Sequence, residues 1–490
     1  MRGNSDIGPG HGDIFDPAES DPEMPGNGLA RAKGLDLTGG PIMSTTVKLA
    51  IPVIISHLLN LAIGIADIIM VGALGKEALA ALVMSNALLN LLFALGWGMC
   101  FAVITHVSQH TGAGRHARAR RSASHAIMFA IALGFVMIVV GNLFLSELFR
   151  PFNAQPDVTE AALSYTGIVF DWMPFFFLIF LGGAIMQGLG DTLTPMIIMF
   201  FINVINILLN YALIFGAWGF PELGIAGAAV GTVTARGVGS LVGLLLLLSG
   251  AYRIVLRIPD FKPYLDEFWG ILRLGIPNSL QSLLRNVNVI LLYSILSLTY
   301  LPTVAQASLG VGFHAEAIAF IPLMGLFIAT GTMVGQNLGA EKSERAEEAS
   351  WASLKVAFVL MVIACLAFLL IPERIVSLFI RDPAVVSSGS WYLRINAITQ
   401  IFQSCFVLVG CLRGAGDSIR PLSAHITGQW IIRLPLAYLL VRYSGLEEWG
   451  VWLAMATSSA IESTIYFWLF RKGDWKRIRI STGANLEDVD

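Results

Sequence analysis

Charged residues are scarce in this sequence. Asp, Glu, Lys and Arg account for 13% of the 490 residues, whereas 56% are hydrophobic. A soluble protein of this length does not need so much apolar surface, because its core cannot take it all up. The low charge content therefore excludes an ordinary soluble protein and indicates one that lies in a membrane.

Other absences narrow the class further. The four cysteines fall within apolar runs and have no CxxC spacing, so we interpret them as small apolar helix residues. The chain lacks HExxH, GxSxG and any suitably spaced carboxylate pair, which argues against a membrane-embedded enzyme. Its polar N-terminal stretch lacks the basic start and apolar core of a signal peptide. We expect no enzymatic activity, no cofactor and no metal.

Long apolar runs fill most of the chain. A helix needs about 20 apolar residues to span a bilayer, and about twelve such runs occur here between short polar turns. The runs are continuous rather than alternating, which excludes a membrane β-barrel. The sequence predicts an all-α polytopic membrane protein with twelve transmembrane helices in two six-helix bundles. We place a disordered tail at 1–42, a first lobe at 43–250, an amphipathic linker at 251–267, a second lobe at 268–471 and a C-terminal tail at 472–490.

Basic residues are concentrated in the loops on one side of the predicted membrane. They include Arg115, Arg118, Arg257, Lys342 and Lys476, whereas the loops of the other side carry few. Short cytoplasmic loops of membrane proteins carry an excess of Lys and Arg. Both tails and the linker are therefore expected to be cytoplasmic.

Short polar motifs recur at a constant distance along the chain. The pairs are LAIP with LGIP, VSQHTGA with VGQNLGA and GLGDTLTP with GAGDSIRP, at offsets of 225, 227 and 226 residues. Nearly equal offsets for three motifs indicate a duplicated unit of about 226 residues. Each unit contains six spans, so both halves enter from the same side and are expected to be related by a pseudo-two-fold axis along the membrane normal, with the substrate path between them.

The repeated GxGD stretch is interpreted as a tight turn between two helices. Asp191 and Asp417 are placed to cap the following helix, which has Pro195 or Pro421 in its first turn. Its repetition then records the duplication and does not mark a reaction site.

Ionisable residues inside a span are costly, so they are functional candidates. In the first lobe, Asp67 ends a polar stripe along the first span, and the fifth span carries a second stripe at similar depth. Burial disfavours the charged form of a carboxylate, which could then alternate between a proton and a cationic guest. Asp67 could instead reach water at the interface, and Asp171 could be a surface residue. We predict coupling roles for Asp67, Asn206, Asn210 and Asp171, and substrate contacts for Asn60, Asn203 and Tyr211.

The second lobe has a different set of polar residues. Arg285 and Glu316 lie at equal depth in the seventh and eighth spans, which predicts an ion pair between them, and Gln400 and Gln403 share one face of the tenth span. Structural and substrate-lining roles are equally open for these four residues. Three further charges within spans have no assignable partner: Arg236, Arg433 and Glu462.

A proline occurs near the start of the first span of each half, at Pro52 and Pro277. Proline removes an intrahelical hydrogen bond and lets a helix bend. We interpret both as conformational hinges, with an ordinary proline at a helix N-terminus as the alternative.

Several stretches together resemble the multidrug and toxic compound extrusion (MATE) family over residues 45–470. They are LAIPVIISHLLNLAIGIADIIMVGALGKEALAAL, VSQHTGAGRHARARR, QGLGDTLTPM, NVINILLNYALIFG, VGQNLGAEKSERAEEA and CLRGAGDSIRPL. The resemblance implies two six-helix bundles around a central cavity and the cation-coupled export of organic, often cationic, compounds. It places Asp67 at the family's first-helix carboxylate and Asn206 and Asn210 at its fifth-helix polar pair.

Three positions depart from patterns within that family. Asn210 stands where many DinF-like members have Asp, Arg285 where the seventh helix often has Glu, and Gln400 where NorM-like members have Asp. Because the second-lobe carboxylates used for sodium are missing, the resemblance favours the DinF-like branch and proton coupling.

The resulting functional hypothesis is a monomeric, proton-coupled antiporter of the bacterial inner membrane that exports drugs by alternating access. A sodium-coupled exporter is one alternative. A flippase for lipid-linked precursors is another, although only Arg236, Arg285 and Arg433 could supply its basic cavity. The major facilitator fold is excluded because the loop after the second span lacks a GxxxDRxGRR-like pattern.

Overall fold

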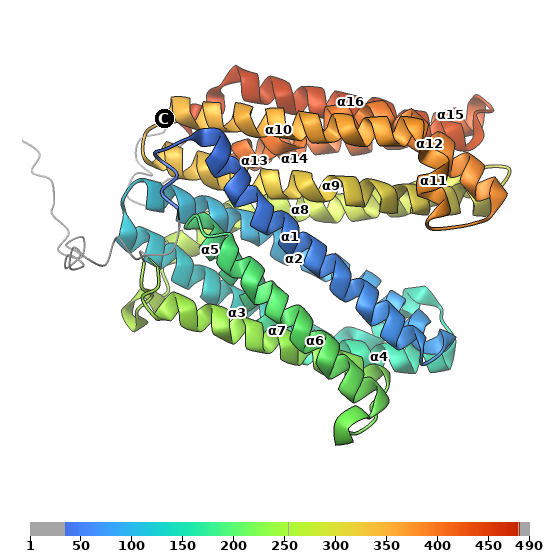
Figure 1. Ribbon diagram of the computed structural model, residues 1–490, viewed down its shortest axis with the longest axis horizontal. Helices are drawn as coiled ribbons and strands as arrows, with labels where there is room; N and C mark the ends of the chain where they lie inside the picture. Colours follow the sequence, from blue (N-terminus) through green and yellow to red (C-terminus); the bar gives the residue numbers. More distant parts are fainter. Residues whose placement is uncertain (1–34, 253, 479, 481–490) are drawn as a thin grey trace, which may run out of the picture.

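The computed structural model describes residues 35–252, 254–478 and 480, and its regular structure is helical throughout that part of the chain (Figure 1). The first half contains α1 (Ile42–Gly72), α2 (Lys76–Gly112), α3 (His116–Phe149), α4 (Pro156–Asp171), α5 (Met173–Gly188), α6 (Leu193–Phe215) and α7 (Ile225–Leu248). The second half contains α8 (Leu265–Leu296), α9 (Pro302–Gly339), α10 (Ser343–Leu370), α11 (Pro372–Ser377), α12 (Pro383–Gln403), α13 (Phe406–Gly414), α14 (Ile419–His425), the π-helix η5 (Ile426–Arg433), α15 (Leu434–Tyr443) and α16 (Glu447–Lys472). Short 3-10 helices lie at Arg150–Phe152, Ala217–Gly219, Ile258–Phe261 and Asp474–Arg477.

Eight helices of the described residues are long and apolar enough to cross a membrane, and α4 with α5, bent by 56°, makes a ninth. The bend has a local cause, because Pro174 lies in the first turn of α5 and cannot continue the hydrogen bonding of α4. The other three expected crossings fall on α8, on α14–η5–α15 and on α16, which are less apolar. The predicted all-α fold with two six-span lobes is confirmed.

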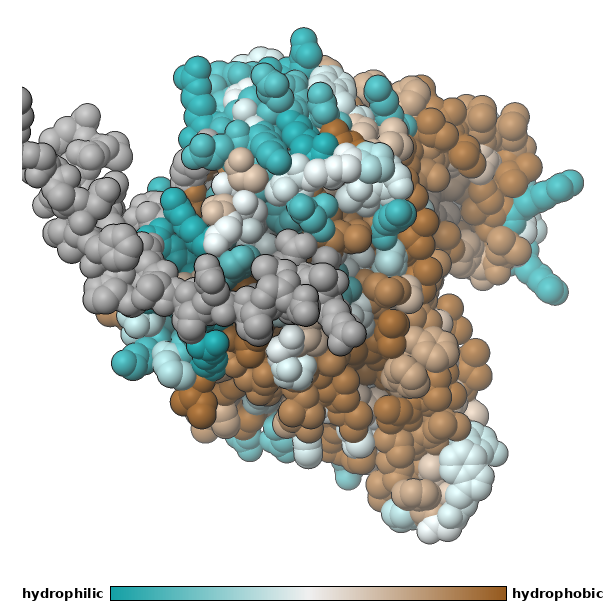
Figure 2. Space-filling model, turned by 60° about the vertical axis from the view of Figure 1, so that its left-hand side comes forward, coloured by the Kyte–Doolittle hydropathy of each residue, from teal (hydrophilic) through white to brown (hydrophobic). Residues whose placement is uncertain are grey.

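The surface of the molecule is divided into apolar sides and a hydrophilic end. Figure 2 shows broad apolar surface along the sides of the helices and hydrophilic side chains gathered towards the end of the molecule that carries the turns 113–115 and 340–342. We call this end, which also carries the two GxGD turns, the basic end. Apolar flanks with polar residues at the helix ends are what a bilayer requires.

At the basic end the two lobes are joined by a reciprocal pair of hydrogen bonds. The Gln109 side chain of α2 donates to the Gly414 carbonyl at 2.9 Å, and the Gln336 side chain of α9 donates to the Gly188 carbonyl at 3.0 Å. Each lobe thus supplies one glutamine from its VxQxxGA motif and one glycine from its GxGD region. We call these four residues the clasp. From the clasp the ribbons of the two lobes diverge towards the other end (Figure 1).

Glycine lets α2 and α9 come close enough for these bonds. A Cβ at Gly112 would lie 1.9 Å from the Gln336 carbonyl oxygen, and a Cβ at Gly339 would lie 2.1 Å from the Gln109 carbonyl oxygen. Both distances are far inside van der Waals contact, and both obstacles are backbone atoms. The glycines of the repeated motif are therefore a packing requirement of the interface between the lobes.

The GxGD turns have the predicted capping role. Asp191 accepts hydrogen bonds from the backbone N–H groups of Leu193 and Thr194, both at 3.0 Å, and Asp417 accepts one from that of Arg420 at 3.1 Å. The glycine before each aspartate has a φ of +85° or +94°, which only glycine adopts without strain. Residue type and backbone conformation thus agree in both copies.

The inner parts of both expected tails pack against the helices at the basic end. Leu37 is fully buried, and its carbonyl accepts a hydrogen bond from Asn337 at 3.1 Å. The Leu35 N–H donates to the Gly190 carbonyl of the first lobe at 3.3 Å, and Trp475 is fully buried after α16. Residues 1–34 and 481–490 of the expected tails lie outside the described residues.

We predict that Gly339→Ala destabilises the protein, because the added methyl group must push α2 and α9 apart. Overpacking of this kind costs about 1–3 kcal/mol. The midpoint of thermal unfolding of the purified protein in detergent measures the effect. Gly64→Ala is the matched control, since a Cβ at Gly64 meets nothing within 4 Å. Equal midpoints for the two variants would show that the lobes do not need this contact.

Candidate functional site

A buried polar cluster lies between α1, α6 and α7 of the first lobe. Asp67 is 8% exposed, and Asn210, which is fully buried, donates a hydrogen bond to its Oδ1 at 2.7 Å. Asn206 lies one turn before Asn210 and donates to the Thr232 hydroxyl at 3.0 Å. Three of the four residues predicted for coupling, Asp67, Asn206 and Asn210, are thus brought together by the fold.

A glycine on α7 gives Asn210 its position. A Cβ at Gly231 would lie 2.1 Å from Oδ1 of Asn210, so any larger residue would displace the amide. That same oxygen has no hydrogen-bond partner among the described residues. The amide therefore presents its donor to Asp67 and leaves a free acceptor in a buried space.

The cluster also contains a positive charge that the sequence left without a partner. Arg236 of α7 lies within electrostatic reach of Asp67 and Tyr165, and its guanidinium carbon lies 4.6 Å from the centre of the Phe176 ring. Arg236 and Asp67 form no direct ion pair among the described residues. The negative charge of Asp67 is thus compensated by one hydrogen bond and by one positive charge at a distance. A proton or a guest cation could take over this compensation.

The other predicted first-lobe residues lie apart from this cluster. Asp171 is exposed at the bend between α4 and α5. Tyr211 is 49% exposed and packs its ring 5.6 Å from that of Trp218. Asn203 is buried, but its side chain donates to the Met199 carbonyl of its own helix at 2.8 Å. Neighbouring residues of a helix point in different directions, which explains why Tyr211 does not follow Asn210.

An apolar cavity of about 1020 Å³, including its open part, lies on the first lobe towards the basic end. Its walls come mainly from α1, α2, α5, α6 and α7 and include Phe101, Trp97 and Phe180. The His57 ring stacks on Trp97 with ring centres 5.8 Å apart. The polar lining consists of neutral groups and His57, with no Asp, Glu, Lys or Arg among the described lining residues: Ser56, His57, Asn60, Gln187 and Ser240.

Asn60 is the predicted substrate contact that lines this cavity. It lies seven residues before Asp67 on α1, which corresponds to about 10 Å along the helix axis. The cavity and the polar cluster around Asp67 are therefore separate, but α1 contributes residues to both. Sequence reasoning missed Trp97 and Phe180, because aromatic residues in apolar runs are usually core residues.

The predicted ion pair between Arg285 and Glu316 is wrong, because no such pair occurs among the described residues. Arg285 of α8 is exposed and lies within electrostatic reach of Glu462 and Tyr466. Glu316 of α9 is partly buried and lies near Tyr392 and Arg433. Equal depth did not bring the charges together, because α8 packs mainly against α2 of the first lobe rather than against α9.

Glu462 is the centre of a buried hydrogen-bond network in the second lobe. Its Oε1 accepts from the Tyr466 hydroxyl at 2.6 Å and lies 3.0 Å from Nδ1 of His425, and its Oε2 accepts from Gln429 at 2.6 Å. These four residues are 3–8% exposed. Gln281 of α8 extends the network, because its amide donates to the Tyr466 hydroxyl at 3.4 Å. This network supplies the partners that the sequence could not assign.

A π-helix shapes this part of the second lobe. Gln429 belongs to η5, and Asn288 of α8 donates to the Gln429 carbonyl at 2.8 Å. At the end of η5, Arg433 donates to the hydroxyls of Ser458 at 2.7 Å and Ser459 at 2.9 Å. Segments of π-helix within membrane helices often occur at functional sites, and this one turns Gln429 towards Glu462.

The remaining predicted residues have simpler positions. Gln400 is 1% exposed, and its side-chain nitrogen has no partner among the described residues, whereas Gln403 is partly exposed. Pro52 lies inside α1 and Pro277 inside α8, and both helices continue through them. Each proline lies several turns into its helix, so neither is a proline at a helix N-terminus, and the hinge role stays a prediction.

Comparison with known proteins identifies related chains. The MatE family model matches residues 52–212 and 279–439, two equal segments 227 residues apart. The chain is 26% identical over 451 residues to "Probable multidrug resistance protein NorM" of Thermotoga maritima, covering 91% of this chain and 96% of the relative. It is 28% identical over 435 residues to a protein of the same description from Rhizobium meliloti, covering 87% and 92%.

Solved structures agree on the fold. A MOP superfamily transporter from Pyrococcus furiosus superposes with a TM-score of 0.85 at 22% identity, over 91% of this chain and 99% of that chain. A structure described as the outward-facing conformation of a MATE family transporter gives a TM-score of 0.84 at 22% identity, with the same coverage.

We predict that Gly231→Ala impairs the polar cluster without touching Asp67 itself. The new methyl group would displace the Asn210 amide, and a lost hydrogen bond to a charged group costs about 1.5–3 kcal/mol. The variant should therefore lower thermal stability in detergent as Asn210→Ala does. Gly237→Ala on the same helix, where a Cβ meets nothing within 4 Å, is the control. If Gly231→Ala behaves like this control, the contact with Asn210 is not needed.

Proposed function

The chain belongs to the MatE family, and we propose from this membership and from the polar cluster of the first lobe that it is a proton-coupled antiporter exporting organic, often cationic, compounds. The observation that carries the proposal is the position of Asp67. This carboxylate is 8% exposed, accepts a hydrogen bond from Asn210 and lies on α1, which also lines the apolar cavity. One helix thus connects an ionisable group to a space for a guest.

The cavity suits large amphipathic molecules. Small-molecule sites are lined mostly by hydrophobic and aromatic side chains, with a few polar groups that fix the orientation of the ligand, and this cavity is lined in that way. Trp97 and Phe180 offer aromatic faces that attract cations as well as apolar groups. Because the described residues of the wall include no Asp, Glu, Lys or Arg, the cavity selects mainly by apolar contact. Such selection fits a transporter of several different drugs, as the relatives' description as multidrug resistance proteins implies.

Protonation of Asp67 is the proposed coupling step. A proton neutralises the carboxylate that Asn210 and Arg236 compensate, and so weakens the contacts holding α1 to α6 and α7. Pro52 lies about four turns away on α1, towards the basic end, and lets that helix bend in response. The bend alters the walls that α1 contributes to the cavity, so the guest leaves as the proton is taken up.

The residues of the second lobe support the proposal of proton rather than sodium coupling. Sodium binds through several oxygen ligands, yet Arg285 and Gln400 occupy positions where the family resemblance implies acids in sodium-coupled members. We place the chain in the DinF-like branch for the same reason.

The basic end is proposed to face the cytoplasm of a bacterial cell, with both termini on that side and the protein acting as a monomer in the inner membrane. The support is the excess of Lys and Arg in the loops of this end. The lobes then alternate between the arrangement in which the clasp joins them and an arrangement open to the cytoplasm.

Transport by purified protein in proteoliposomes tests the proposal, with pH and sodium gradients imposed separately. We expect a cationic dye to be exchanged when a proton gradient is present, and Asp67→Asn to abolish exchange while the protein remains folded. Asp171→Asn is the control, because this exposed carboxylate lies outside the cluster. Dye exchange that survives in Asp67→Asn would refute the coupling role.

The same assay separates the alternatives. Exchange driven by sodium alone would identify a sodium-coupled exporter. Movement of a pyrophosphate-bearing lipid without any dye exchange would identify a flippase.

We also predict that Trp97→Leu weakens binding of aromatic cations. Loss of one cation–π and stacking face costs about 0.5–2 kcal/mol, which corresponds to roughly a 2- to 30-fold rise in Kd. Fluorescence titration of a cationic dye against the purified protein measures it. Trp468→Leu is the control, since Trp468 is 58% exposed on α16 and lies outside the cavity. An unchanged Kd in Trp97→Leu would show that the guest binds elsewhere.

A further inference from the structure

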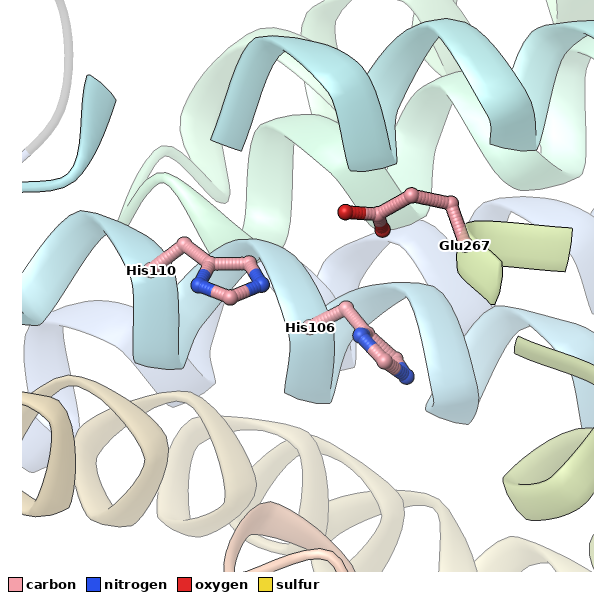
Figure 3. A group of neighbouring side chains, drawn as sticks. All are labelled: His106, His110 and Glu267. Atoms are coloured by element: carbon pink, nitrogen blue, oxygen red, sulfur yellow. The ribbon is translucent and has the colours of Figure 1, made fainter. Parts of the chain in front are cut away.

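Three potential metal ligands meet at the basic end, away from the polar cluster around Asp67 and outside the described walls of the cavity. His106 and His110 lie one turn apart on the same face of α2, and Glu267 lies in the first turn of α8. One ligand atom from each lies within 4.8 Å of the other two. In Figure 3 the carboxylate of Glu267 reaches from α8 towards His110, and the two imidazoles project from successive turns of α2.

The burial of His106 is unusual for a side chain whose ring nitrogens lack hydrogen-bond partners among the described residues. His106 is 3% exposed and His110 6%, and neither ring nitrogen of His106 has a hydrogen-bond partner among the described residues. An unsatisfied buried polar atom costs about 1–3 kcal/mol. A bound ion that takes a lone pair from the ring would remove part of that cost.

The backbone of α8 leaves room for the imidazole. A Cβ at Gly270 would lie 2.9 Å from Cε1 of His106, so a side chain at that position would press on the ring. Gly270 thus lets the start of α8 lie directly against the turn of α2 that carries His106. This contact brings the Glu267 carboxylate close to the two histidines.

We propose that His106, His110 and Glu267 form a binding site for a divalent transition metal of the zinc type. Two imidazoles and one carboxylate, with water in the fourth position, are a ligand set that zinc uses in proteins. Calcium and magnesium are disfavoured because they require mostly oxygen ligands. The Ser122 hydroxyl of α3 donates to Oε2 of Glu267 at 3.1 Å, which orients the carboxylate as outer-shell partners do.

The site closes by side-chain rotation. Zinc bonds of 2.0–2.1 Å in a tetrahedron place ligand atoms roughly 3.3 Å apart, closer than the 4.8 Å within which they lie here. The positive charges of Arg115 and Arg118 lie within electrostatic reach of His110 and oppose a cation, whereas Glu267 supplies the negative charge. We therefore expect weaker binding than at a structural zinc site, as suits a regulatory ion.

The location gives the site a consequence, which rests on the proposed function. α2 belongs to the first lobe and α8 to the second, so a bound ion joins the lobes at the same end as the clasp. Alternating access requires this end to open. A metal ion would hold it closed, and zinc is therefore expected to inhibit transport from the side of the basic end.

Isothermal titration of Zn²⁺ into the full chain, purified without a polyhistidine tag, tests the site. We expect one ion per chain in the wild-type protein, and a rise in Kd of about 10-fold or more in His110→Ala and in Glu267→Gln. Co²⁺, whose visible absorption reports tetrahedral coordination, should give the same stoichiometry. His314→Ala is the control, because this exposed histidine lies on α9 away from the site.

Two results would overturn the proposal: no saturable binding to the wild-type chain, or binding that neither variant weakens. Glu267→Gln carries the test alone if His110→Ala fails to fold, since Glu267 is partly exposed at a helix start. Asp67→Asn, which removes the proposed coupling, should bind zinc as the wild type does. Failure of the metal site is thereby distinguished from failure of the transport proposal.

Discussion

The close approach of α2 and α9 at the basic end is the constraint on which the arrangement of the two lobes depends. Two glycines allow the helices to touch, and the reciprocal bonds of Gln109 to Gly414 and of Gln336 to Gly188 join one lobe to the other. The duplicated sequence makes the interface symmetric, because each half provides one glutamine and one carbonyl. The repeated polar motifs are therefore evidence of a duplication, and their residues also form the contact between the two duplicated lobes.

The two lobes share this framework but carry different chemistry. The first lobe holds Asp67 with a single amide donor and a charge at a distance, next to an apolar cavity. In the second lobe, by contrast, Glu462 is fixed by three hydrogen-bonding side chains. A carboxylate with few partners changes its protonation state more readily than one held in a full network, since fewer contacts must break. This difference favours the first lobe as the place of coupling and the second as its support.

Much of this organisation could be predicted from the sequence. Composition and run length predicted the all-α membrane fold, and helical spacing brought Asp67, Asn206 and Asn210 together because each stripe follows one face of one helix. The Arg285–Glu316 pair failed because depth in the membrane does not determine which way a helix faces. The partners of Glu462 come from three segments, one of them a π-helix, and no period in the sequence shows such a distortion. Likewise, Glu267 meets His106 and His110 only because α8 crosses α2, a contact between distant parts of the chain.

The central claim is that the protonation of Asp67 biases the lobes between two arrangements. Spin labels at Trp218→Cys and Tyr300→Cys, both strongly exposed and placed in different lobes beyond the ends of α6 and α8, report the separation of the lobes away from the clasp. Electron paramagnetic resonance distance measurements in lipid should show two populations whose ratio changes between neutral and acidic pH, and a ratio that no longer responds to pH when Asp67→Asn is added. A single population at every pH, or a full pH response without the Asp67 carboxylate, would contradict the account.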